Sequence, residues 1–441
     1  MTTRQATWFS AVAIVALVAT ACGGSGSHKA KQSSAPDTAA GRTTTAPPGK
    51  YPPVNQPGVT PTEIRVSGIA STTNPTGVLY GTAFDGVQAY FDMVNGEGGV
   101  YGRRLVLANR HDDQTGSNRR EVEAILDQDH PFAVLPVSVV LFTGSDLLAK
   151  AGIPTFGWNI QDDWTGPQNF FAQTGALCNG SACPNPTLPW LAGKLGRTRV
   201  AVLAYTVAQS ADCADMIKAS FDKYPSAKVV VLDKSLAFGV TDLSADVKKM
   251  ADAKVDLVTT CMDANGVLTL AREMRQQGVN ALQYFPDGYD HEFMAKYGGF
   301  FEGSIVGVQE APLETKPSFP ALTEFVRWMD KAGYRKTENA EVGWVNAAQF
   351  VAGLRAAGPD FTQQKVVDAI NHAPPFDAGG MIAPLTWPRA HTDKFSGLRC
   401  TAFVKVHDSK FVPQFSPAGK PFTCLDPNLP DVTKAQPTYL K

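Results

Sequence analysis

Apolar and polar residues alternate along this chain with two periods, which follow one another in a regular order. The run Glu63–Ile69 alternates with a period of two and ends in small residues, which is typical of a β-strand. Tyr80–Val94 then carries apolar residues at the spacing of an amphipathic helix. Glycines crowd the next stretch, 96–102, and end that helix. The folded region is therefore predicted to open with a strand followed by a helix.

The same order of strand and helix continues as far as Phe285. Further strands are predicted at 104–108, 132–136, 153–157, 199–204, 228–232, 257–260 and 283–285. Further helices are predicted at 119–128, 145–151, 211–223, 243–253 and 267–277. Strands that alternate with helices form parallel sheets with helices on both faces. Because a cysteine-bearing loop divides the alternation into two series, we predict an α/β fold with two lobes.

The N-terminus has the pattern of an export signal. Arg4 is followed by an apolar stretch from Trp8 to Ala21, which is shorter than the about 20 residues that span a bilayer as a helix. We therefore interpret residues 1–21 as a signal peptide that is removed, with a short anchoring helix as the alternative.

Cys22 follows the small residues of the segment 18–21 (VATA), and this order resembles the bacterial lipoprotein cleavage box. In that box the cysteine receives the lipid and becomes the new N-terminus. Ala19 stands where the box most often has leucine, so ordinary cleavage beside an incidental cysteine is the alternative. Residues 22–58 are rich in Gly, Ser, Ala, Thr and Pro and cannot bury enough apolar surface to fold. They are predicted to form a lipidated, flexible tether.

The overall charge excludes one class of partner. The 441 residues are 44% hydrophobic and 18% charged, and the formal net charge is −1. No run of Lys or Arg is longer than a pair. A nucleic-acid-binding surface needs concentrated positive charge, so we expect no nucleic-acid partner.

Cysteine usage favours disulfides. Of the seven cysteines, setting Cys22 aside leaves six, an even number in a protein predicted to be exported. The predicted pairs are Cys178 with Cys183 across a short loop, Cys400 with Cys424 around a predicted β-hairpin, and Cys213 with Cys261 by elimination. Free buried thiols are the alternative for the last pair. Zinc binding at the first pair is disfavoured because no second ligand pair lies at a suitable spacing, so no metal site is expected.

The stretch DGVQAYFDMVNGEGGVYGRRLVLANRHDDQ at 85–114 strongly resembles the type 1 periplasmic binding proteins. The branch that it resembles contains the branched-chain amino-acid (Leu/Ile/Val) binding proteins of ABC importers. Shorter matches keep the family's order between Val59 and Val412: VTPTEIR at 59–65, YG at 80–81, AGIP at 151–154, TDLS at 241–244 and DGY at 287–289. Each motif alone is weak, and their order carries the resemblance.

The resemblance implies two Rossmann-like lobes, joined by three hinge crossings, that close over a ligand. The crossings are expected near 172–177, 307–312 and 383–390. Lobe 1 then comprises 59–175 and 310–385, and lobe 2 comprises 176–309 and 386–441. The resemblance also implies a lipid-anchored monomer on the outer face of the cell membrane. Such a protein passes a small amino-acid-like, aromatic or apolar acid to ABC permease subunits and needs no cofactor.

Part of the predicted ligand site lies at the strand ends of lobe 1, because ligands of parallel sheets bind where loops and helix N-termini converge. Tyr80, Ser138, Trp158 and Asn159 follow strands there. Ser138 matches the family's position for a hydroxyl that binds the ligand carboxylate, and a helix cap is the plainer role for it. Trp158 replaces a small residue of many amino-acid binders. Unless it is a core side chain, its flat apolar ring indicates an aromatic or extended apolar ligand.

Tyr205, Asp287 and Trp344 complete the predicted site. Tyr205 follows a strand, and Trp344 falls where many family members have a helix-borne tyrosine, with a buried helical tryptophan as the alternative. Asp287 matches the family's acid that pairs with a ligand ammonium, and a sealed cleft requires such pairing because an unpaired buried charge is costly. Hydrogen bonding of Asp287 to Gly288 or its neighbours is the structural alternative. The aromatic rings are expected to wrap an apolar body, with the polar side chains at its ends.

The sequence contains little that is typical of an enzyme. It contains no Gly-x-Ser-x-Gly elbow and no phosphate loop, and the zinc-protease pattern that begins at His291-Glu292 is broken by Ala295. The triplet 111–113 (His-Asp-Asp) resembles a ligand cluster but coincides with the family's acidic turn at a strand end. We therefore expect a binding protein and not an enzyme. Receptors of this fold continue into a membrane helix, whereas this sequence ends at Lys441, so the alternative is a lipoprotein that feeds a separate sensor.

Overall fold

The computed structural model describes residues 50–174, 179–286, 288–392 and 398–440. Several predictions fall wholly or partly outside these ranges: the signal peptide 1–21, the lipidated Cys22 with the tether up to residue 49, part of the crossing near 172–177, Cys178 and the site residue Asp287.

The last part of the predicted tether contacts the folded region. The ring of Tyr51 meets that of Tyr101 edge-on, with 5.5 Å between centroids. Arg103 donates a hydrogen bond from Nη2 to the Pro52 carbonyl at 3.0 Å. Contacts with the folded region therefore begin before residue 58.

Five parallel strands form one of the two sheets made by the described residues. They are β1 (Glu63–Ala70), β2 (Arg104–Asp112), β3 (Ala133–Ser138), β4 (Thr155–Gly157) and β5 (Phe170–Ala172), in the order β2-β1-β3-β4-β5. Most of β1 and all of β3 are buried. A parallel sheet that is covered on both faces needs such nearly continuous apolar runs.

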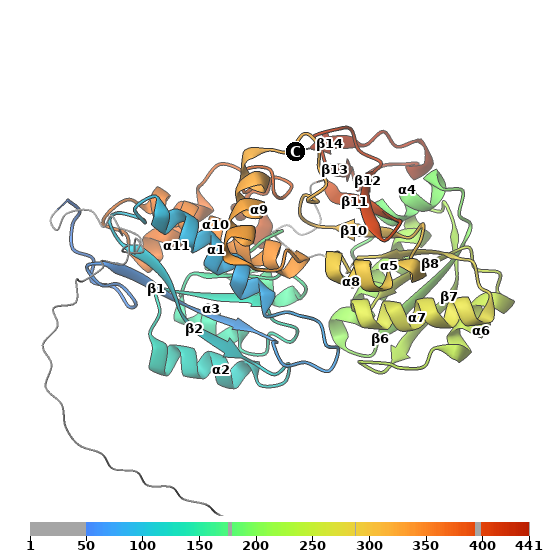
Figure 1. The fold of residues 1–441 in the computed structure, drawn as a ribbon, viewed down its shortest axis with the longest axis horizontal. Helices are drawn as coiled ribbons and strands as arrows, with labels where there is room; N and C mark the ends of the chain where they lie inside the picture. Colours follow the sequence, from blue (N-terminus) through green and yellow to red (C-terminus); the bar gives the residue numbers. More distant parts are fainter. Residues whose placement is uncertain (1–49, 175–178, 287, 393–397, 441) are drawn as a thin grey trace, which may run out of the picture. The chain divides into compact units, whose positions relative to one another are not determined.

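Helices from two separate parts of the chain pack on the five-stranded sheet or on one another. They are α1 (Thr82–Gly96), α2 (Asn118–Ala124), α3 (Ser145–Ala151), α9 (Pro320–Ala332), α10 (Glu338–Ala357), α11 (Gln363–Asn371) and α12 (Trp387–Thr392). Figure 1 shows the later helices, in orange, beside the blue and teal elements. In the shared core, Phe350 of α10 lies 6.1 Å from Phe91 and 5.5 Å from Phe156 between ring centroids. This core therefore depends on both parts of the chain.

The second sheet has nine strands within the described residues. They are β6 (Arg199–Tyr205), β7 (Lys228–Leu236), β8 (Leu257–Cys261), β9 (Leu282–Phe285), β10 (Ile305–Val308), β11 (Arg399–His407), β12 (Lys410–Gln414), β13 (Phe422–Leu425) and β14 (Thr438–Leu440). Strands β6 to β10 are parallel, and β11 pairs antiparallel to β10. Its helices are α4 (Thr187–Lys194), α5 (Ala208–Lys223), α6 (Ser244–Asp252), α7 (Ala264–Gln277) and α8 (His291–Tyr297). These elements are the green, yellow and red ones in Figure 1.

Helices α1 and α10 touch through two glycines. A Cβ on Gly86 would lie 1.9 Å from the Ala340 carbonyl oxygen, and a Cβ on Gly343 would lie 1.9 Å from that of Ala83. Only glycine fits such a close approach of two backbones. The two helices are therefore held at a spacing that no larger side chain allows.

The predicted disulfides are borne out where both cysteines are described. Cys213 on α5 is bonded to Cys261 at the end of β8, and Cys400 on β11 is bonded to Cys424 on β13. Cys183 is also disulfide-bonded. The described disulfides thus brace the nine-stranded sheet.

Contacts between chain segments mark where the chain passes from one sheet to the other. Gln173, just after β5, donates from Nε2 to Oε1 of Gln309, just after β10, at 3.3 Å. Trp387 of α12 packs its ring edge-on against Phe171, at 5.1 Å between centroids. Helix α12 therefore belongs with the five-stranded sheet, and the chain reaches β11 only after Thr392, later than the expected crossing near 383–390.

The predicted α/β fold with parallel sheets is confirmed, and each predicted strand and helix up to Phe285 has a counterpart. The predicted helix at 119–128 divides into α2 and a turn of π-helix, Ile125–Asp129. Three short 3₁₀ helices occupy Asp162–Trp164, Gly298–Phe300 and Val432–Lys434. Among the described residues, no helix combines the length and the apolar character needed to cross a membrane.

Candidate functional site

The carboxyl ends of β1, β3 and β4 lie next to one another, because these strands are parallel neighbours in the five-stranded sheet. The loop after β1 carries Tyr80, β3 ends at Ser138, and β4 is followed by Trp158 and Asn159. The four residues predicted from this part of the sequence therefore come from adjoining strand ends.

Tyr80 and Trp158 form an aromatic pair. Their ring centroids are 5.7 Å apart and the rings are tilted by 45°. Tyr80 is buried and Trp158 is half-buried, so part of the indole surface is open. The Trp158 amide donates to the Pro136 carbonyl at 3.1 Å, and the Asn159 amide donates to Gln173 Oε1 at 3.1 Å. These backbone bonds fix the loop after β4 and do not involve the indole ring.

Ser138 is fully buried and joins β3 to the start of α10. Its Oγ donates to Asn339 Oδ1 at 2.9 Å. Two residues before Asn339, the hydroxyl of Thr337 lies 2.7 Å from that of Thr82 and connects the starts of α1 and α10. Amides in the first turn of both helices already have partners: Thr82 donates to the Leu79 carbonyl at 3.1 Å, and Ala340 donates to Thr337 Oγ1 at 3.2 Å. Asn339 was not predicted, because 201 residues separate it from Ser138.

Tyr205 and Trp344 are engaged elsewhere. The Tyr205 hydroxyl donates to Asp263 Oδ2 at 2.6 Å, inside the core of the nine-stranded sheet. Trp344 is 2% exposed and meets the rings of Tyr90 and Phe325 edge-on, at 4.8 Å and 5.4 Å between centroids. The structure therefore brings together the predicted residues at the strand ends of the five-stranded sheet, and it gives Tyr205 and Trp344 partners in the packed interior.

A cavity of about 330 Å3 opens at the start of α10. Its lining comes from the loop after β1, the start of α7, the loop after β9, helix α8 and the residues 335–339. Arg335 pairs there with Asp290 at 3.5 Å and with Glu292 at 3.0 Å. Asn339 lines this cavity, whereas the predicted site residues that the structure describes do not. The cavity therefore adjoins the predicted site through the Ser138–Asn339 bond.

Two further hydrogen bonds connect loops of the two sheets. Gln209, at the start of α5, donates from Nε2 to the Val140 carbonyl at 3.0 Å. Asn265, at the start of α7, donates to the carbonyl of Thr76 in the loop after β1. The second sheet thus reaches the strand ends of the first through side-chain amides.

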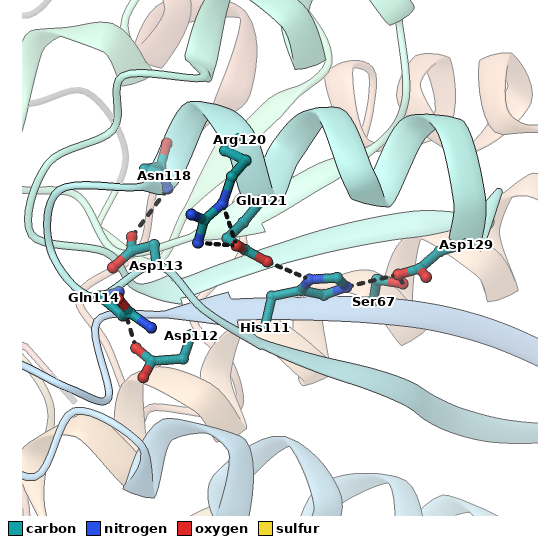
Figure 2. A network of polar contacts seen from close by, with 9 residues as sticks. All are labelled: Ser67, His111, Asp112, Asp113, Gln114, Asn118, Arg120, Glu121 and Asp129. Carbon is teal, nitrogen blue, oxygen red and sulfur yellow. Dashed lines mark hydrogen bonds and ion pairs between the residues drawn. The ribbon is translucent and has the colours of Figure 1, made fainter.

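The His111 cluster is structural. Figure 2 shows the imidazole between two carboxylates: Nδ1 lies 3.0 Å from Glu121 Oε2 and Nε2 lies 2.9 Å from Asp129 Oδ2. Ser67 donates to Asp129 at 2.7 Å and does not bond the imidazole, so the arrangement is not a nucleophilic triad. These bonds tie β1 and β2 to α2 and the π-helical turn.

The neighbouring acids, Asp112 and Asp113, hold the turn after β2. Asp112 Oδ1 accepts the amides of Thr73 and Gln114, each at 3.0 Å. Asp113 accepts from Asn118 Nδ2 at 3.1 Å (Figure 2). The structural interpretation of the triplet 111–113 accounts for all of these contacts.

One group of three potential metal ligands occurs in the described part of the chain, and all three are exposed: Glu302, His407 and Asp408. Glu302 accepts from the Asp408 amide at 2.9 Å and lies 2.8 Å from His407 Nδ1. These mutual contacts account for the group as a bridge between the β11–β12 turn and the residue after the 3₁₀ helix Gly298–Phe300.

Comparisons with known proteins agree with this architecture. The family model described as periplasmic binding protein matches residues 63–410. No curated protein matches the chain. Among solved structures, a branched-chain amino acid ABC transporter protein from Thermus thermophilus with bound valine is 17% identical, with 80% of this chain and 96% of that chain covered and a TM-score of 0.65.

Two other solved structures have different ligands in their descriptions. A fatty acid ABC transporter substrate-binding protein from Thermomonospora curvata is 17% identical, covers 87% of this chain and 97% of its own, and has a TM-score of 0.67. A solute-binding protein from R. palustris in complex with benzoate is 16% identical, covers 80% and 95%, and has a TM-score of 0.62. At these identities the likeness establishes the fold.

The chain belongs to the periplasmic binding protein family. The resemblance to the type 1 members and the predicted fold are confirmed. The family consists of extracytoplasmic binding proteins that work with ABC transporters and are not enzymes, which also confirms that a binding protein is the correct class.

Proposed function

We propose that this protein binds a small acid with an apolar or aromatic body at the strand ends of the five-stranded sheet and delivers it to ABC permease subunits. The observation that carries the proposal is the Tyr80–Trp158 ring pair beside Ser138 and Asn159. The exposed part of the indole ring contacts the apolar body, and Ser138, at the position where the family places a hydroxyl against the ligand carboxylate, receives the carboxylate. Asp287, by its place in the sequence, pairs with a ligand ammonium where one is present.

The ligands named for the related structures support this class. Valine, a fatty acid and benzoate each carry a carboxyl group on an apolar body. What changes among them is the length and flatness of that body, which is the property that a tryptophan in place of a small residue alters. We therefore favour an aromatic or extended apolar acid over a short amino acid.

Ligand capture proceeds by closure of two lobes in this proposal. Lobe 1 is 59–175 and 310–385, and lobe 2 is 176–309 and 386–441, with α12 added to lobe 1 because Trp387 packs on Phe171. Ligand contacts to both lobes favour the closed state. Tyr205 and Trp344 support the walls through Asp263 and Tyr90.

The proposed location is the outer face of the cell membrane. After removal of residues 1–21, a lipid on Cys22 anchors the monomer, and the residues before Lys50 act as the tether. Mass spectrometry of the mature N-terminus tests this, and a Cys22→Ser variant should be released into the medium. Retention of that variant on the membrane would contradict a lipid anchor at Cys22.

A thermal-shift screen tests the ligand class. The chain from Lys50 onward keeps the contacts of Tyr51 and Pro52 and is exposed to amino acids, aromatic acids, fatty acids and amides. A ligand that binds only the native state raises the melting temperature. We expect aromatic or apolar acids to do so and Trp158→Ala to lower their affinity roughly 10- to 100-fold.

Trp328→Ala is the matched control, because Trp328 is also half-buried but lies on α9 against Lys331. It should leave the thermal shift unchanged. A response to amides alone, or equal losses in both variants, would sink the proposed site. Uptake of the identified ligand by membrane vesicles then tests delivery to a permease, and binding without uptake would favour delivery to a sensor.

A further inference from the structure

Two buried glutamates lie near the crossing between the sheets. Glu310 follows β10 and is 0% exposed, and Glu341, in the first turn of α10, is 1% exposed. The four carboxyl oxygens of these residues have no hydrogen-bond partner among the described residues. An isolated ionised carboxylate in such a place is costly, so the fold favours the neutral, protonated form.

The crossing segment that carries Glu310 is fixed on both sides. Gln309 accepts the hydrogen bond from Gln173, the Glu310 backbone bridges to Ile382, and the Ala311 amide donates to the Met381 carbonyl at 2.8 Å. This segment therefore touches two other stretches of chain that belong to the five-stranded side. A displacement of the Glu310 side chain therefore shifts the backbone of the crossing segment.

Glu341 lies on α10, the helix that shares a hydrophobic cluster with the crossing segment. Its helix is pinned at the start by the Ser138–Asn339 bond and by the hydroxyl pair of Thr82 and Thr337. Ala311 and Ala340, the neighbours of the two glutamates, belong to one hydrophobic cluster. Both acids are buried, and the charge of Glu310 acts on Glu341, so the crossing segment and α10 place two carboxyl groups within electrostatic reach of each other.

The surroundings add negative charge. Glu314, farther along the crossing, accepts from the Tyr289 hydroxyl at 2.6 Å and lies 2.6 Å from His291 Nε2. Glu338 lies one turn before Glu341 on α10. The other titratable groups facing the pair thus comprise two carboxyls and a tyrosine, with one histidine on α8 that is already engaged by Glu314.

Burial raises the pKa of both acids, and like charges add to the rise for Glu341. Burial raises the pKa of Glu310 to about 8. Burial, and then the charges of Glu310, Glu338 and Glu314, raise the pKa of Glu341 well above its usual range. The stability contributed by the proton form is fully present below the unfolded pKa of about 4.5 and, for Glu310, is lost as the pH rises through about 8.

We propose that Glu310 and Glu341 are a proton-dependent lock on the hinge: protonated, they stay buried between the crossing segment and α10, and ionised, they loosen the crossing and favour the open form. The lock rests on the lobe closure proposed above. Its physical cause is that two like charges cannot share a dry interior without a partner, so ionisation draws the carboxylates toward water.

The test uses the full chain without ligand, so that it is independent of the ligand's identity. Melting temperature and radius of gyration, the latter from small-angle X-ray scattering, are measured between pH 5.5 and 8.5. We expect the melting temperature to fall by roughly 3–6 °C and the radius of gyration to rise with pH. The variant Glu310→Gln with Glu341→Gln mimics the proton form and should lose both responses.

A double variant of two exposed acids, Glu97→Gln with Glu123→Gln, serves as the control and should respond like the original chain. Either single glutamine variant should show an intermediate response if the double variant does not fold. An unchanged pH response in the glutamine variants would overturn the proposal. A melting temperature that depends on pH while the radius of gyration stays constant would also overturn it, because the acids would then act on stability alone.

Discussion

The two sheets position their strand ends in different ways. On the five-stranded side, α1 and α10 are fixed by backbone contact at Gly86 and Gly343. On the nine-stranded side, the Cys213–Cys261 disulfide ties α5 to β8. The strand ends of a sheet can therefore be fixed by close helix packing or by a covalent bond. The strand ends fixed by packing are those that carry Trp158.

Two aromatic residues at strand ends make the same contrast. Tyr205 ends β6, is 2% exposed and gives its hydroxyl to Asp263. Trp158 follows β4, is half-buried and contacts Tyr80 through its ring. Strand ends in the two sheets thus differ, because Tyr205 has a buried polar partner and Trp158 is partly exposed. A residue at a strand end can bind a ligand only if its own side-chain contacts leave part of it exposed.

The largest effect is expected from the helix contact. Gly343→Val places a branched side chain where the Ala83 carbonyl lies, so α1 and α10 must separate. We expect a loss of at least about 4 kcal/mol in the free energy of unfolding, measured by urea denaturation. Gly299→Val is the control, because nothing lies within 4 Å of a Cβ at that position. Equal losses in the two variants would show that the helix contact has no special role.

The disulfide should have a somewhat smaller effect. Changing Cys213 and Cys261 together to serine removes a link between residues 48 positions apart, which we expect to cost about 2–4 kcal/mol. The original chain, measured with and without a reducing agent, gives an independent comparison. The affinity of any ligand identified in the thermal-shift screen should change less than in Trp158→Ala. The reverse order would contradict the division of roles between the two sheets.

The smallest effect is expected from Tyr205→Phe. This change removes one buried hydrogen bond to Asp263 and should cost about 1–2 kcal/mol of stability. Asp263 still caps α7 by accepting from the Asn265 amide at 2.9 Å, so the helix should persist in circular dichroism spectra. A loss of ligand affinity as large as that of Trp158→Ala would instead show that Tyr205 contacts the ligand.

Sequence patterns predicted the alternating part of the fold because each strand and helix there leaves a local signal. Val66 and Ile69 alternate into a sheet, and Phe84 and Val87 recur at helical spacing. Helix α10 leaves no such signal, since it is buried on nearly every side and its apolar residues show no stripe. Its discovery needed the three-dimensional contacts of Phe350 with the sheet.

The candidate site was predictable to a similar degree. Trp158 and Ser138 follow from the rule that ligands bind beyond strand ends, which requires only the strand limits. Asn339 and Glu310 could not be found in this way, because each depends on a partner that is distant in sequence, Ser138 and Glu341. Long-range pairs of polar groups have no periodicity and become visible only in the folded chain.

The chain returns to the five-stranded sheet late in the sequence, so the parts of this core are synthesised at different times. Helix α10 packs against β3 and β4 and is synthesised long after both strands. The core of the five-stranded sheet cannot be completed until α10 and α12 have been synthesised, because Phe350 and Trp387 are part of it. This core is therefore finished only when most of the chain has been made, although its first strand is near the start of the folded region.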